Sequence, residues 1–73
     1  MEGLIEGRMV HFVVNANQHR AAIVVNILSK ESGICDLFVF SMPQDERGGF
    51  FMQVGAAYDE SKNIDTWHCI EKA

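Results

Sequence analysis

The segment Arg20 to Leu28, RAAIVVNIL, is the longest apolar segment of the 73-residue chain. Its Ile-Val-Val centre consists of β-branched residues, whose restricted χ1 angles favour an extended strand over a helix. Both alternating sets of side chains along the segment are apolar, so we expect it to be partly buried on both sides. A long, bent strand shared between two small sheets would provide such surroundings. The segment therefore predicts a β fold built around one central strand.

The remainder of the chain from residue 9 onward also shows strand and turn patterns. The further predicted strands are Met9–Val14, Ile34–Phe40, Phe50–Tyr58 and Thr66–Ile70. Turn-forming residues lie between them, and Gly55 indicates a bulge in the fourth strand. The loop Ser41–Gly49 contains the only proline and a glycine pair, and we expect it to be the most mobile connection.

The third predicted strand indicates which of its faces is buried. Asp36 carries a carboxylate that is costly to bury unpaired, so the face that holds it should be the wetter one. Because side chains alternate along a strand, the two faces can be assigned from this residue alone. The wetter face should carry Ile34, Asp36, Phe38 and Phe40, and the inward face Cys35, Leu37 and Val39.

Five short strands joined by short loops predict a small, all-β, five-stranded antiparallel barrel of the SH3-like kind. An OB-like barrel is the alternative, although it would usually have a helix where this chain has Ser41–Gly49. We expect residues 9–73 to form this single domain. Residues 1–8 contain Ile5-Glu6-Gly7-Arg8, which resembles a factor Xa cleavage sequence, directly before Met9. They are interpreted as a possible tag or disordered leader, the alternative being a native turn at Gly7-Arg8.

Composition excludes several classes of partner. The net charge is −4 and the basic residues form no cluster, which argues against nucleic acid, whose affinity depends on contacts from Lys and Arg to phosphates. No apolar run approaches the ~20 residues that span a bilayer, and no signal-peptide pattern begins the chain. We therefore expect no membrane partner and a cytoplasmic location, in a bacterial host cell. Cys35 and Cys69 are expected to be free, buried thiols, with a disulfide as the alternative.

His11, His19, His68 and Cys69 are the residues that could bind a metal ion. None of them forms a C-x-x-C or H-x-x-x-H pair, and the adjacent His68 and Cys69 should point to opposite faces of a strand. We therefore predict no metal site and no cofactor. The chain also lacks a strained glycine elbow beside a nucleophile, which predicts no catalytic residues and a protein that is not an enzyme.

Four short motifs follow one another along the chain: His19-Arg20-Ala21-Ala22-Ile23-Val24, Leu37-Phe38-Val39-Phe40, Tyr58-Asp59-Glu60 and Thr66-Trp67-His68. Their layout resembles that of a set of small uncharacterised phage and prophage proteins, over nearly the whole length from Met9. Those proteins often continue after T-W-H with another aromatic residue and then proline, whereas this chain continues with Cys69-Ile70. The departure weakens the case for a site on the last strand. The resemblance implies a phage-derived protein and no particular activity.

The functional hypothesis rests on a surplus of aromatic side chains. If Asp36 faces water, Phe38 and Phe40 share its face, and the Phe50–Met52 stretch cannot fit entirely inside one barrel. Exposed apolar patches usually mark protein contacts, so we predict a non-enzymatic interaction or self-assembly module that binds a protein partner or forms a homo-oligomer. A nucleic-acid-binding barrel and a small hydrolase using His and Cys are the alternatives. The candidate partner-binding residues are Phe38, Phe40, Phe50, Met52, Tyr58, Trp67, His19 and His68.

Trp67 has two interpretations. Its ring could close the open end of the barrel, with the indole N–H donating to a carbonyl group or to water. Alternatively it could form an aromatic platform for a partner, together with Tyr58 and either His68 or His19.

Overall fold

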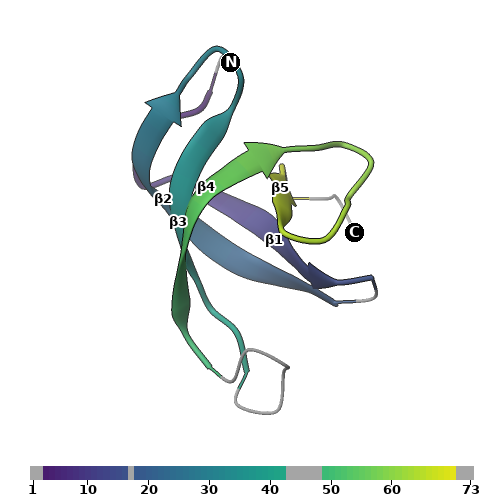
Figure 1. Cartoon of the computed structure of the whole chain (residues 1–73). Helices are drawn as coiled ribbons and strands as arrows, with labels where there is room; N and C mark the ends of the chain where they lie inside the picture. Colours follow the sequence, from purple (N-terminus) through teal and green to yellow (C-terminus); the bar gives the residue numbers. More distant parts are fainter. Residues whose placement is uncertain (1–2, 17, 43–48, 71–73) are drawn as a thin grey trace.

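A computed structural model describes residues 3–16, 18–42 and 49–70 and shows an all-β chain whose strands close into a small barrel (Figure 1). The predicted fold class is confirmed. No helix in these residues is long and apolar enough to cross a membrane. The strands are β1 (Met9–Asn15), β2 (Gln18–Ser29), β3 (Ile34–Val39), β4 (Phe51–Tyr58) and β5 (Thr66–His68).

The order of strands around the barrel is their order along the chain. This order fits an SH3-like barrel better than an OB-fold, in which the strands follow a Greek key. Four of the strand pairs are antiparallel, but β4 and β5 are parallel, which corrects the expectation of an entirely antiparallel barrel. The parallel contact pairs only Ala57 with Thr66 and Tyr58 with Trp67, so it is too short to have a recognisable pattern in the sequence.

β2 is the long central strand that the sequence predicts, and it pairs with both β1 and β3. Register shifts between Val24 and Asn26 and between Ile27 and Ser29 bend it around the barrel. Ala22 and Val24 are buried, whereas Val25 is exposed. Ile27, from the alternating set opposite to Ala22 and Val24, is partly buried against the core cluster beyond the first register shift. The expected burial on both sides therefore holds for part of the strand.

The predicted faces of β3 are confirmed. Cys35, Leu37 and Val39 are completely buried, and the residues between them are partly exposed. The fold also provides hydrogen-bond donors for Asp36, the carboxylate on the outer face of β3. Asp36 Oδ1 accepts a hydrogen bond from the Gly55 amide at 2.9 Å, and its Oδ2 accepts one from Asn26 Nδ2 at 3.1 Å.

Gly55 lies at the bulge that the sequence indicates. Pairing between β3 and β4 shifts register between Cys35 and Leu37, opposite this part of β4. Gly55 has a φ of 69°, a left-handed conformation that glycine adopts without the penalty of a Cβ atom. The bulge directs the Gly55 amide at Asp36, so the outer carboxylate joins β2, β3 and β4.

The described part of the leader belongs to the folded domain. Leu4 is 1 % exposed and is part of the hydrophobic core cluster. The Gly7 amide donates to the Val24 carbonyl at 2.6 Å, and the Val24 amide donates to the Arg8 carbonyl at 3.0 Å. This packing differs from the expected disordered leader, and it agrees with the alternative of a turn at Gly7-Arg8 that leads into β1.

Candidate functional site

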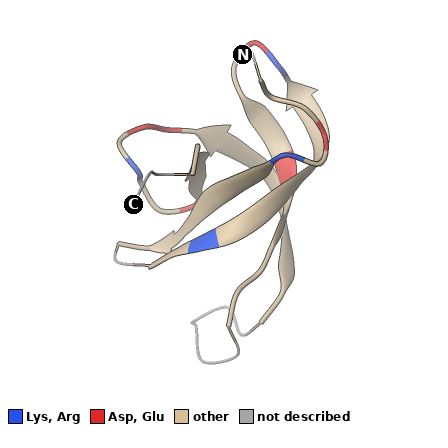
Figure 2. Ribbon diagram, turned by 180° about the vertical axis from the view of Figure 1, so that it is seen from behind, with Lys and Arg blue, Asp and Glu red and all other residues tan. Residues whose placement is uncertain are grey.

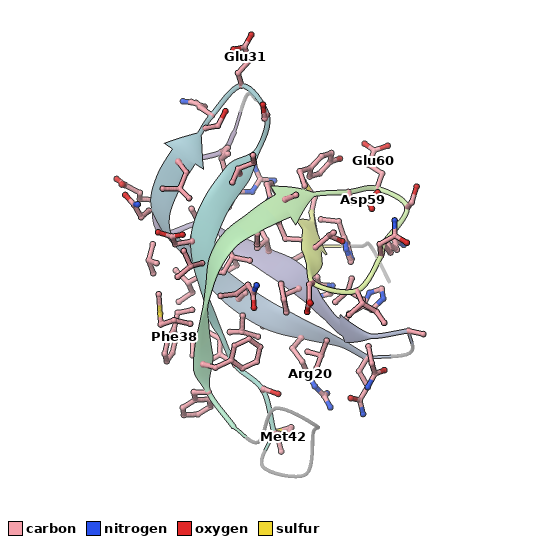
Figure 3. The ribbon with its side chains drawn as sticks, in the orientation of Figure 1. Arg20, Glu31, Phe38, Met42, Asp59 and Glu60 are labelled. Carbon is pink, nitrogen blue, oxygen red and sulfur yellow. The ribbon has the colours of Figure 1, made fainter. Side chains whose placement is uncertain are left out.

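The outer side of the β3–β4 hairpin carries a cluster of aromatic rings, which we call the aromatic face and define as Phe38, Phe40, Phe50 and Met52. The ring centroids are separated by 5.2 Å for Phe38 and Phe40, 6.0 Å for Phe38 and Phe50, and 5.8 Å for Phe40 and Phe50. Met52 lies directly opposite Phe38 in the register of the two strands. Figure 3 shows Phe38 pointing away from the barrel, on the outer side of this hairpin.

The aromatic face is exposed and uncharged. Phe50 is 69 % exposed and Met52 is 51 % exposed, while Phe38 and Phe40 are partly exposed. Residues 37–42 and 49–58 contain no Asp, Glu, Lys or Arg. Among the described residues, Figure 2 shows the charged residues mainly on the barrel body, the β2–β3 turn and the loop before β5.

Phe51 does not belong to the aromatic face. It is partly buried against the core, where its ring centroid lies 5.9 Å from that of Phe12. Of the two consecutive phenylalanines, Phe51 therefore packs against the core and Phe50 remains outside, because side chains alternate along an extended chain. The single chain therefore has exposed aromatic surface outside its core. This surface belongs to the aromatic face, in which Met52 accompanies the three phenylalanine rings.

Trp67 is a core residue and cannot serve as an exposed platform. It is 1 % exposed, and its Nε1–H donates a hydrogen bond of 2.7 Å to the carbonyl of Gly33. Its ring contacts Tyr58 with a centroid distance of 4.9 Å. The capping interpretation is thus the correct one, and the assignment of Trp67 to partner binding is wrong because its ring is enclosed.

Tyr58 and the loop after it form a hydrogen-bonded unit. The Tyr58 hydroxyl donates to Glu60 Oε1 at 2.5 Å, and this bond is the main cause that raises the pKa of Tyr58 to about 12. Asp59 accepts hydrogen bonds from Asn63 Nδ2 at 2.6 Å and the Ser61 amide at 2.8 Å, which together lower the pKa of its carboxyl group. Asp59 therefore shapes the turn before β5, and Tyr58 is already engaged within the chain.

The three histidines come together on the outer side of β1. His11 lies directly opposite His68 of β5, and His19 of β2 lies opposite Val13, two residues further along β1. One side-chain nitrogen from each histidine lies within 4.8 Å of the other two. His68 is buried and His11 and His19 are half-buried. The Nδ1 atom of His68 makes no hydrogen bond, although the residue has other contacts.

Local spacing could not reveal this cluster, because each histidine comes from a different strand. His68 is buried and Cys69 is exposed. His11 is half-buried. Only the closure of the barrel, which pairs residues 11 and 68, produces the contact. His19 and His68 contact each other and His11, so they belong to a second cluster of rings, while Phe40 of the aromatic face pairs with β2 at Ala21.

The two thiols differ in environment, and neither forms a disulfide. Burial, with a smaller contribution from the charge of Asp36, raises the pKa of Cys35 to about 11. Cys69 is exposed, which corrects the expectation that both thiols are buried. Its sulfur accepts a contact of 3.6 Å from Arg8 Nη2.

We expect iodoacetamide to modify Cys69 and to spare Cys35 in the folded protein at pH 8. The thiolate is the reactive species, and Cys35 combines burial with a raised pKa, which keeps it protonated. Intact-mass spectrometry should show one adduct under native conditions and two in urea. A Cys69→Ser variant should show none until it is unfolded. Modification of Cys35 at the rate of Cys69 would contradict the buried position.

The described part of the chain contains no pocket that could enclose a small substrate. The geometry therefore offers two features with chemical or binding potential, the aromatic face and the histidine cluster. The chain matches no protein-family model, and neither the curated proteins nor the solved structures gave a significant match.

Proposed function

We propose that the protein is a non-enzymatic self-assembly module in which the aromatic face of one copy packs against the same face of a second copy. The observation that carries this proposal is the exposed and uncharged cluster of Phe38, Phe40, Phe50 and Met52. Monomeric proteins rarely leave such contiguous apolar surface in water. Covering it removes the cost of hydrating it.

Burial of the aromatic face would contribute favourable free energy to association. Burial of apolar surface contributes roughly 25 cal/mol per Å², and a phenylalanine side chain buries about 150 Å² or more. Phe50 and Met52, the most exposed members, would therefore contribute several kcal/mol on each copy. Their neighbours Phe38 and Phe40 already hold each other in edge contact, so little side-chain freedom would be lost on binding.

A second copy is favoured as the occupant by charge and by symmetry. The chain has a net charge of −4, yet the hairpin that carries the aromatic face has no charge among residues 37–42 and 49–58. The four side chains of the aromatic face carry no charge, so contact between these side chains does not itself bring like charges together, although Asp36 shares the outer face of β3. A two-fold dimer uses the same patch on both subunits, and it is the commonest form of homo-oligomer.

Nucleic acid is a less favoured occupant. An aromatic cluster can stack on bases, but single-strand binders combine such stacking with a basic groove that follows the backbone. No Lys or Arg occurs in the two segments that carry the aromatic face. The absence of charge supports a protein occupant. We also propose a cytoplasmic location and a phage origin, the second of which the resemblance implies.

Sedimentation equilibrium of the wild-type chain is expected to show a concentration-dependent mass that rises from 8.2 kDa toward twice that value. Replacement of Phe50 by serine should weaken the dimer at least tenfold, because roughly 1.4 kcal/mol of lost contact energy corresponds to that factor. Phe50 is exposed in the single chain, so Phe50→Ser should leave the thermal unfolding midpoint of the monomer unchanged.

Ile64→Ser is the matched control. Ile64 is 54 % exposed but lies in the loop between β4 and β5, away from the aromatic face. This variant should dimerise as the wild type does. A wild-type chain that stays monomeric at every concentration, or an equal loss of association in both variants, would overturn the proposal. In the first case the aromatic face would be left for a different protein partner.

A further inference from the structure

We infer that His11, His19 and His68 form a binding site for a divalent transition-metal ion of borderline softness, with Zn²⁺ as the ion that fits it best. The site is independent of the aromatic face, since it lies on β1, β2 and β5 instead of the β3–β4 hairpin. It uses all three histidines of the chain. The inference depends on their geometry, their chemistry and their support from the backbone.

The geometry needs only side-chain adjustment. The candidate nitrogen atoms lie within 4.8 Å of one another. Around a tetrahedral Zn²⁺ with Zn–N bonds of about 2.05 Å, the nitrogens are separated by about 3.3 Å. Rotation of the rings about χ1 and χ2 could close this difference without movement of the strands.

The rings already face one another. The centroid distances are 4.8 Å between His19 and His68, 5.7 Å between His11 and His68, and 6.5 Å between His11 and His19, all with steep interplanar angles. In such contacts the edge of one ring meets the face of another. The three rings are therefore in mutual contact, and the separations of their nitrogen atoms show that these atoms converge.

The chemistry of the donors selects the class of ion. Imidazole suits Zn²⁺, Cu²⁺ and Ni²⁺, whereas Mg²⁺ and Ca²⁺ require oxygen ligands. Among the described residues the cluster holds no cysteine and no carboxylate, so three neutral nitrogens are the protein ligands. Three histidines leave one position of a tetrahedral ion for water or an exogenous ligand.

The backbone supports the site from three strands. His11 and His68 are direct cross-strand neighbours, and His19 is placed by its pairing with Val13. Val13 is completely buried although it lies outside the core cluster, which shows that the outer side of β1 is covered close to the histidines. A bound ion would also fasten β5, which has only two paired residues on each side, to β1 and β2.

Titration of the full chain with ZnCl₂ in an isothermal calorimeter should give one ion per chain with a dissociation constant in the micromolar range. Zinc at one hundred times that constant should raise the unfolding midpoint by about 10 to 20 °C, because the ion binds the folded state. The Co²⁺ form should show the visible d–d bands of tetrahedral nitrogen and oxygen coordination, without a thiolate charge-transfer band.

His19→Gln and His11→Gln are the test variants, since both residues are half-buried and the fold should tolerate the change. Each should weaken Zn²⁺ binding at least tenfold, because loss of an outer-shell partner alone commonly costs about 10- to 100-fold. Cys69→Ser is the control: it alters the neighbour of His68 and should bind as the wild type does. Wild-type binding no tighter than millimolar, or binding that both histidine variants retain, would overturn the inference.

Discussion

Replacement of Trp67 by alanine is expected to remove a large share of the free energy of unfolding at 25 °C. The side chain is the largest one fully buried, and its removal should cost about 3 to 5 kcal/mol through lost burial and the cavity that remains. A domain of this length has a total stability of only about 4 to 11 kcal/mol. Loss of the Nε1 hydrogen bond would also leave the Gly33 carbonyl without its indole donor. Urea unfolding followed by far-ultraviolet circular dichroism measures the effect.

Two comparison variants separate the contributions of Trp67. Trp67→Phe keeps most of the ring burial but removes the donor to Gly33, so its cost should be smaller, about 1 to 3 kcal/mol. Ile70→Ala changes an exposed side chain of the same C-terminal region and should lie within about 0.5 kcal/mol of the wild type. A Trp67→Ala protein as stable as the Ile70→Ala protein would contradict the core position of the ring.

Leu4→Ala is the second substitution with a large expected effect, a loss of about 2 to 5 kcal/mol in the free energy of unfolding. Leu4 is 1 % exposed and packs in the core cluster, although it precedes the first strand. The same urea titration measures the loss. The result matters because the sequence alone leaves open whether residues 1–8 are a leader outside the domain or a native turn that enters the first strand.

Ile5→Ala provides the matched control for Leu4. Ile5 is the next residue along the chain and is 58 % exposed, so its truncation should change the stability by no more than about 0.5 kcal/mol. Equal stability of the two variants would show that the leader does not pack on the barrel. A clear difference between them would establish that the leader is a structural part of the domain.

The features predicted correctly from the sequence are those that depend on neighbouring residues. The faces of β3 follow from one carboxylate and the alternation of side chains, and the bulge at Gly55 follows from a glycine inside a strand pattern. Both signals come from residues that are close together in the sequence, so they do not depend on how the rest of the chain packs. The prediction of a barrel follows in turn from the number of strands and the shortness of the loops.

The features that were missed depend on contacts between distant residues. Leu4 packs in the core because the chain folds back beside Val24, and no periodic pattern extends across the leader. His11, His19 and His68 carry no ligand spacing, since barrel closure alone brings them together. Two interpretations of Trp67 stayed open for the same reason, because its indole donor binds the carbonyl group of Gly33, 34 residues away in the chain.

The pairing of β1 with β5 has a consequence for the rate of folding. Its partners, His11 and His68, are far apart along the chain, whereas the β1–β2, β2–β3 and β3–β4 pairs join consecutive strands. Closing a long loop costs chain entropy before any contact compensates for it. The consecutive hairpins should consequently form early and the docking of β5 should come last, so that the crossing of the main kinetic barrier coincides with the arrival of the C-terminal strand.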